Sequence, residues 1–246
     1  GSIGLKLQKL NHSVYGVTNN KTNAKKAKDR KLANIVSCNF SILQECSLVI
    51  LALPIKDLVN PSKDLIAAIP KTAIVTDVGS VKVPIVKTWE KINPLFIGSH
   101  PMAGTEKSGV EAGYENLFDN ATWVITPNAK SDKDSLEKLS KLITAMGSKI
   151  IHTSPELHDQ AVALISHLPI FLSSCLIRTA CTNDNQSLLN LSYKLAATGF
   201  ADTSRVGGGN PILGLDLAKN NQDNIIYSLK LLKDNISKIE ETIKNK

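Results

Sequence analysis

The segment Ser47–Pro54, with the sequence Ser-Leu-Val-Ile-Leu-Ala-Leu-Pro, contains an uninterrupted apolar run. Such a run is typical of a strand that is buried on both faces, as in a parallel sheet covered by helices. Further strand patterns lie on both sides of it, at 14–18, 73–78, 95–98, 122–126 and 149–153. Helical patterns lie between several of them, at 22–32, 58–68, 83–92 and 133–146. The alternation predicts an α/β fold with a doubly wound, mostly parallel sheet.

The strand patterns end at about residue 153. Ser154-Pro155 is a helix start, because it offers a capping hydroxyl followed by proline at the first helical position. From there we expect only helices, at 156–181 with a break at Pro169, and at 187–197, 211–219 and 222–244. The last helix carries isoleucine and leucine at helical spacing, which indicates a core face or a subunit interface. We therefore predict two domains, 1–153 and 154–246, of which the second is all-helical.

Composition excludes several classes of protein. Of the 246 residues 42% are hydrophobic, which excludes a wholly disordered chain, and the 4% of aromatic residues disfavour a stacking surface for nucleic acid. The net charge of +7 comes from lysines that are spread along the chain, so we expect no nucleic-acid partner. We also expect no membrane span, because apolar runs stay below about 20 residues and His167 and Pro169 interrupt the longest.

The cysteines and the N-terminus contain no sign of a metal site or of secretion. The four cysteines form no C-x-x-C pair and have no histidine at ligand spacing, so we expect no metal. The N-terminus has no pattern of a cleavable signal. We expect a cytoplasmic protein with reduced cysteines.

The first residues, Gly1-Ser2-Ile3-Gly4, lead into a helix that is followed by the strand at 14–18. In a dinucleotide-binding βαβ unit this is the far end of the glycine-rich turn, its helix and the second strand. The first strand and most of the fingerprint would then precede residue 1. The alternative is that Gly1-Ser2 is a remnant of cloning.

In such a unit the residues after Val17 face the adenosine ribose. An acidic residue there prefers the 2′-hydroxyl of NAD, whereas Thr18-Asn19-Asn20-Lys21 suits a 2′-phosphate. We therefore expect NADP rather than NAD. Leu53 and Pro54 lie at the end of the buried strand in 47–54, where the cofactor crevice of an open α/β sheet would lie. The candidate cofactor-binding residues are Gly1, Thr18, Asn19, Asn20, Leu53 and Pro54.

Two segments bring polar side chains to the ends of predicted strands. In Asp77–Lys82, Ser80 is placed to hydrogen-bond a ligand, or alternatively to cap the helix that begins near Val83. In Gly98–Thr105, His100 follows a strand and is held between small residues and a proline. A histidine so placed is a candidate general base, although an isolated histidine is more often structural.

Two further segments lie in the helical part. Ile165–Pro169 contains His167 just before the expected helix break. Phe200–Pro211 contains Arg205 beside three glycines, and an arginine is suited to clamp a carboxylate. The alternatives are a salt bridge at a domain interface for Arg205 and a simple connector for the glycines. We interpret His12, His152 and His158 as structural.

Taken together, TDVGSVK, GSHPMAGTEKSG, ISHLP and GFADTSRVGGGNP resemble the prephenate/arogenate dehydrogenases of tyrosine biosynthesis. The last motif is most similar to the arogenate dehydrogenases of cyanobacterial type. The resemblance covers essentially the whole chain. It implies a Rossmann-type domain, a helical domain that forms the homodimer, and an active site in the cleft between them.

The resemblance also implies roles for individual residues. His100 corresponds to the catalytic base at the ring 4-hydroxyl, and Ser80 to the serine that assists it. Arg205 corresponds to the arginine that holds a substrate carboxylate, and His167 to a histidine of the substrate pocket. Thr105 and Gly209, in the same motifs, are further candidate substrate-binding residues.

The implied reaction converts arogenate to tyrosine, with hydride transfer to NADP and loss of CO2. Prephenate, which gives 4-hydroxyphenylpyruvate, is the competing substrate. A β-hydroxyacid dehydrogenase would need a catalytic lysine in 156–181, and there is none. The alternative from another class is a catalytically inactive, dimeric ligand-binding module.

Overall fold

The computed structural model describes residues 1–104 and 109–245. The chain folds into two compact units, Gly1–His158 and Asp159–Lys246. The division lies inside helix α7 (Pro155–Val162), a few residues beyond the predicted domain boundary at 153/154. The boundary at 153/154 stays a prediction.

Unit 1 is built on a five-stranded sheet with the order β3-β4-β5-β6-β7. Strands β3, β4 and β5 are parallel, whereas β6 is antiparallel to β5 and parallel to β7. The predicted fold class, α/β with a mostly parallel sheet followed by helices, is confirmed. The strands are β3 (Leu48–Leu51), β4 (Ile74–Asp77), β5 (Phe96–Pro101), β6 (Thr122–Thr126) and β7 (Lys149–His152).

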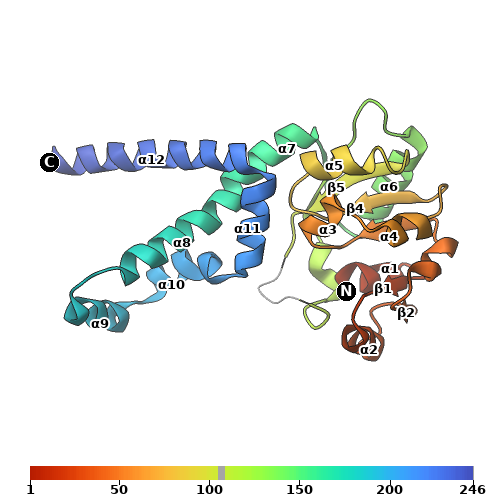
Figure 1. Cartoon of the computed structure of the whole chain (residues 1–246), viewed down its shortest axis with the longest axis horizontal. Helices are drawn as coiled ribbons and strands as arrows, with labels where there is room; N and C mark the ends of the chain where they lie inside the picture. Colours follow the sequence, from red (N-terminus) through yellow and green to blue (C-terminus); the bar gives the residue numbers. More distant parts are fainter. Residues whose placement is uncertain (105–108, 246) are drawn as a thin grey trace. The chain divides into compact units, whose positions relative to one another are not determined.

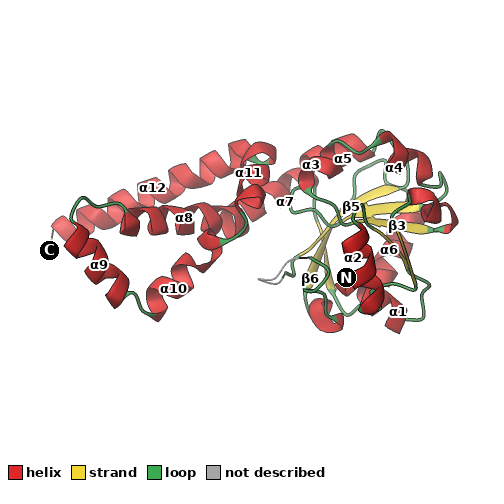
Figure 2. Cartoon of the chain, turned by 60° about the horizontal axis from the view of Figure 1, so that its bottom comes forward, coloured by secondary structure: helices red, strands yellow, loops and turns green. Residues whose placement is uncertain are grey.

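Helices cover both faces of this sheet, which explains the apolar strand at its start (Figure 2). Helices α3, α4 and α5 lie on one side, and α1 and α6 on the other (Figure 2). On the second side Leu7, Trp123 and Ile143 belong to one buried cluster. The helices are α1 (Ser2–Lys9), α2 (Lys21–Asp29), α3 (Ile55–Val59), α4 (Lys63–Ala68), α5 (Val83–Trp89) and α6 (Lys133–Ala145), with short 3-10 turns η1 (Phe40–Glu45) and η2 (Glu115–Phe118).

A separate pair of parallel strands, β1 (Tyr15–Val17) and β2 (Ile35–Ser37), precedes the main sheet. A cavity of about 640 Å³ lies between β1 and β3, lined mainly by apolar residues of α1, β1, η1 and β3.

Gly4 allows α1 to pack closely against the chain that enters β2. A Cβ atom at this position would lie 2.1 Å from the carbonyl oxygen of Leu32. Close approach of the first helix is the role of the third glycine in the dinucleotide-binding fingerprint. Gly1, three residues earlier, lies at the N-cap of α1.

Two features of unit 1 differ from the prediction. The helix expected at 58–68 is divided into α3 and α4, because Pro61 lacks a backbone N–H and cannot continue α3. Ser62 starts the next helix by accepting a hydrogen bond from the backbone of Leu65 at 3.2 Å. Strand β2 was not predicted, since it offers only two apolar residues, Ile35 and Val36, before Ser37.

Unit 2 is helical, as predicted (Figure 1). The predicted break at Pro169 is wrong, because the chain stays helical from Pro155 to Cys181. A wider π turn, η3 (Ala163–His167), ends two residues before the proline, and such a turn accommodates a missing N–H. The other elements are α8 (Leu168–Cys181), α9 (Gln186–Leu195), α10 (Thr198–Ser204), η4 (Arg205–Gly208), α11 (Pro211–Asn220) and α12 (Gln222–Lys244).

The continuous helix Pro155–Cys181 is long and apolar enough to cross a membrane by length and composition. This differs from the prediction, which counted His167 and Pro169 as interruptions. Only 22% of its most apolar window is buried inside the single chain. The helix therefore presents an exposed apolar surface, which is typical of an interaction site.

Candidate active site

His100 lies within β5, not after the strand as predicted, in the part of β5 that pairs with β6. It is opposite Val124 of β6, and its neighbour Ser99 is fully buried. The Ser99 hydroxyl donates to the Asp77 carbonyl oxygen at 2.7 Å and accepts from the Trp123 indole at 3.0 Å. Because β6 pairs with His100 and Asp77 of β4 holds the adjacent Ser99, the backbone of His100 has a defined position.

A buried ion pair lies beneath this strand end. The Lys82 ammonium donates to the Asp77 carboxylate and, at 2.7 Å, to the Ser99 carbonyl oxygen, and both side chains are fully buried. The Asp77 carboxylate also accepts from the backbone N–H groups of Gly79 at 2.9 Å and Ser99 at 3.1 Å. Burial raises the pKa of the Asp77 carboxyl, whereas Lys82 and the two amides favour its charged form. The pair ties the end of β4 to β5.

The side chain of His100 meets a second histidine. His100 Nδ1 lies 2.9 Å from His158 Nε2, and the two rings are 5.1 Å apart, inclined at 70°. His158 is 2% exposed, whereas His100 is half-buried. From the sequence, His158 was interpreted as structural, so this contact was not predicted. The one signal for it was the helix start at Ser154-Pro155, which places His158 in the first turn of α7.

Ser80 is half-buried in the turn between β4 and α5, next to the fully buried Val81. The alternative role as a helix cap does not apply, because the N-cap of α5 is Lys82. Since β4 and β5 are parallel, their ends meet at one edge of the sheet. Ser80 and His100 thus belong to the same edge.

The structure separates the six candidate cofactor residues into two groups. Gly1, Thr18 and Leu53 line the cavity between β1 and β3. Asn19, Asn20 and Pro54 are exposed, and Asn20 caps α2 by accepting from the backbone of Thr22 at 2.8 Å and of Asn23 at 3.1 Å.

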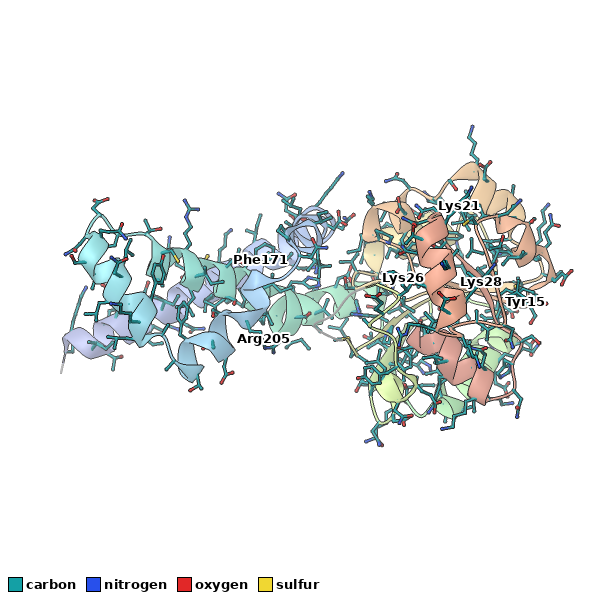
Figure 3. All side chains as sticks on the ribbon, turned by 90° about the horizontal axis from the view of Figure 1, so that it is seen from below. Tyr15, Lys21, Lys26, Lys28, Phe171 and Arg205 are labelled. Carbon is teal, nitrogen blue, oxygen red and sulfur yellow. The ribbon has the colours of Figure 1, made fainter. Side chains whose placement is uncertain are left out.

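Helix α2 carries a row of lysines directly after β1. Lys21, Lys26 and Lys28 lie along this helix (Figure 3). Lys26 is paired with Glu111 at 2.8 Å. A shallow hollow of about 420 Å³ is lined by Lys21, Lys25, Lys28, Ser37 and Cys38, among others. This cationic hollow suits an anionic group.

The remaining candidates belong to unit 2. His167 is fully buried in η3, with Nδ1 3.2 Å from the side-chain nitrogen of Asn221. Arg205 is exposed at the start of η4, and Gly209 is exposed at its end (Figure 3 labels Arg205). Thr105 lies outside the described residues. In residues 1–104 and 109–245 no group of three or more ligand-type side chains could hold a metal ion.

The glycines beside Arg205 have a packing role that was not predicted. Gly207 lies against α8, where a Cβ atom would be 2.5 Å from the backbone nitrogen of Ser174. The Gly207 N–H donates to the Ser173 hydroxyl at 2.8 Å, and that hydroxyl donates to the Thr203 carbonyl oxygen at 2.8 Å. These contacts fix η4, and Arg205 with it, to α8.

Two family models together match nearly the whole chain. Residues 3–152 match the nucleotide-binding domain of prephenate dehydrogenase, and residues 154–246 match its dimerization domain. A curated relative, prephenate dehydrogenase of Bacillus subtilis, is 34% identical over 75% of this chain. The match spans 50% of that relative's own length.

Solved structures are similar over the full chain. The arogenate dehydrogenase of Synechocystis has a TM-score of 0.85 and 38% identity, covering 99% of this chain and 88% of that one. The prephenate dehydrogenase of A. aeolicus, in complex with hydroxyphenyl propionate and NAD+, has a TM-score of 0.92 and 28% identity, covering 99% and 86%.

Proposed function

The chain belongs to the prephenate dehydrogenase family, and we propose that it converts arogenate to tyrosine by oxidative decarboxylation with NADP. The observation that carries the choice of arogenate is the 38% identity to an arogenate dehydrogenase over 99% of the chain. The segment Asp202–Pro211, with its three consecutive glycines, supports the same choice.

His100 is proposed as the base that takes the proton of the ring 4-hydroxyl. Its place on β5, paired with β6 and next to the anchored Ser99, suits this role, because a base must be held within hydrogen-bond reach of its proton. Ser80, at the same sheet edge, is proposed to hydrogen-bond that hydroxyl. When bound, the nicotinamide cofactor supplies the acceptor for the hydride from the ring carbon. Loss of the ring carboxylate as CO2 then makes the ring aromatic.

Arg205 is proposed to bind a carboxylate of the substrate through paired N–H groups, which lysine cannot offer. Its attachment to α8 through Gly207 supports the role, since a clamp needs a fixed base. We assign His167, Thr105 and Gly209 to substrate binding because their motifs resemble those of the family.

NADP fits the residues that follow β1. No carboxylate stands among the residues 18–23, and Lys21 is the first residue of α2. Because the Asn20 oxygen already caps α2, its amide nitrogen is the group left to donate to a phosphate. The cationic hollow beside α2 supports the same choice.

The second candidate is oxidation of prephenate with NAD. It is favoured by the relative from Bacillus subtilis, a prephenate dehydrogenase, and by the NAD+ in the A. aeolicus structure. Both candidates place the protein in aromatic amino acid biosynthesis, and we propose a cytoplasmic homodimer formed by the helical unit.

Absorbance of the reduced nicotinamide tests the proposal directly. Purified protein is mixed with arogenate or prephenate, each with NADP or NAD. We expect the highest kcat/KM for arogenate with NADP. Faster reduction with prephenate would assign the second candidate. No reduction in any mixture, with substrate binding retained, would favour the inactive ligand-binding module.

A further inference from the structure

The contact between His100 and His158 restricts where each ring carries its proton. At 2.9 Å the two nitrogens share one hydrogen bond, so one must donate and the other accept. Both rings cannot be doubly protonated in this arrangement, because two N–H groups would then face each other. The state of His158 therefore determines which nitrogen of His100 carries the proton.

Only one of the two arrangements leaves His100 able to act as a base at its other nitrogen. If His158 Nε2 donates, neutral His100 carries its proton on Nε2, which is then a donor. If His100 Nδ1 donates, Nε2 of neutral His100 is the unprotonated nitrogen, which can accept a proton. A base at Nε2 thus requires His158 Nε2 to be the acceptor and Nδ1 of His158 to hold the proton.

Helix α7 holds His158 in place for this task. Its first turn is capped by Ser154, whose hydroxyl accepts from the backbone of Leu157 at 3.1 Å. The His158 N–H donates to the Ser154 carbonyl oxygen at 3.0 Å. With 2% exposure, the imidazole of His158 is also confined by packing. Both partners are therefore fixed, His100 by the sheet and His158 by the helix.

We propose that His158 is a positioning residue that holds His100 in the Nδ1–H tautomer and stabilises the imidazolium formed when His100 takes a proton. The proposal rests on the proposed function for the role of His100 as a base. An orienting partner of this kind acts through the base and touches neither substrate nor cofactor.

Replacing His158 by phenylalanine and by glutamine separates packing from hydrogen bonding. Phenylalanine keeps a ring but cannot accept a hydrogen bond, whereas the glutamine oxygen can. We expect His158→Phe to lower kcat by about 10²-fold with KM unchanged, and His158→Gln to recover a large part of it. In a His100→Ala background, His158→Phe should cause no further loss. His152→Phe, at an exposed position on β7, is the matched control.

Side-chain 15N NMR of the full chain without ligands reads the tautomer independently of activity. We expect wild-type His100 to show a protonated Nδ1, and His158→Phe to shift it toward the Nε2–H form. A wild-type His100 protonated on Nε2, or His158→Phe with normal kcat, would overturn the proposal. If no mixture of substrate and cofactor reacts, the proposed function is wrong. The NMR measurement of the His100 tautomer still shows whether His158 positions His100.

Discussion

At the residue scale, Ser99 and His100 show how one strand serves two purposes. Successive residues of a strand point to opposite faces. Ser99 joins the buried network of Asp77, Lys82 and Trp123, whereas His100 contacts His158. The buried residue thus holds the strand while the half-buried one is available for chemistry.

Substituting His100 by alanine should lower kcat by about 10²- to 10⁴-fold, the usual contribution of a general base. The KM for the cofactor should stay within a factor of about two, since the imidazole acts in the chemical step. Steady-state kinetics measure both constants, with His152→Ala as the control. Unchanged kcat in His100→Ala would remove His100 from the mechanism.

Substituting Arg205 by alanine should mainly raise the KM for the substrate. A charge-assisted hydrogen bond contributes about 1.5–3 kcal/mol, which corresponds to roughly 10- to 100-fold in KM. Arg178, on α8, offers a matched arginine in the same unit, and Arg178→Ala should leave KM unchanged. Equal effects of the two substitutions would point to a general loss of positive charge.

At the element scale, the buried Asp77–Lys82 pair joins β4 to β5. Lys82→Met should destabilise the chain by about 3–5 kcal/mol, because it leaves a buried carboxylate without its partner. The double variant Asp77→Asn with Lys82→Met should recover part of this loss. Chemical denaturation measures both. A double variant less stable than Lys82→Met would show that the unpaired Asp77 carboxylate is not the cause of the lost stability.

The folding stability of Lys82→Met should depend on pH. Burial raises the pKa of Asp77 and the Lys82 charge lowers it, so without Lys82 this pKa rises further in the folded chain. The folded chain then binds a proton that the unfolded chain releases, and stability falls as pH rises. Lys82→Met should therefore lose more stability, relative to the wild type, at about pH 8 than at about pH 5. The opposite trend would show that Lys82 does not hold Asp77 in its charged form.

The glycines of η4 provide a matched pair of variants. A Cβ atom at Gly207 would lie 2.5 Å from backbone of α8, whereas at Gly208 nothing lies within 4 Å. Gly207→Ala should cost about 1–3 kcal/mol and lower Tm by several degrees, and Gly208→Ala should be near neutral. Similar Tm values for the two variants would show that η4 is not fixed to α8.

Elements with a long or strong pattern could be predicted from the sequence. The range 222–244 matches α12, and the six predicted strands all occur, because periodicity and apolar runs are local features. Strand β2 and helix α10 were missed, since each offers too few apolar residues to form a pattern, and α10 buries none. The continuity through Pro169 depends on a π turn that no local pattern indicates. The pairing of His100 with His158 is a tertiary contact between a strand and a helix 58 residues apart.

At the scale of the whole molecule, the helical unit exposes many large apolar side chains in the single chain. On α12, Ile236, Ile239 and Ile243 are 52%, 60% and 68% exposed. A surface of this kind is typical of an interface, in agreement with the match to a dimerization domain.

Light scattering should give a mass twice that of the chain. Aspartate at Ile236, Ile239 and Ile243 together should reduce it to that of the monomer, because charges disfavour burial in an interface. Ile151→Asp, at a similarly exposed position in unit 1, is the control. A wild-type monomer would contradict the homodimer.

Transfer of an isotope label from substrate to cofactor tests the proposed hydride transfer from the ring carbon. Arogenate carrying deuterium at the carbon that bears the hydroxyl is incubated with the protein and NADP, and both products are analysed by mass spectrometry. We expect deuterium in the reduced nicotinamide and unlabelled tyrosine in equal amount. Reduced cofactor without deuterium, or tyrosine that retains it, would contradict hydride transfer from this carbon.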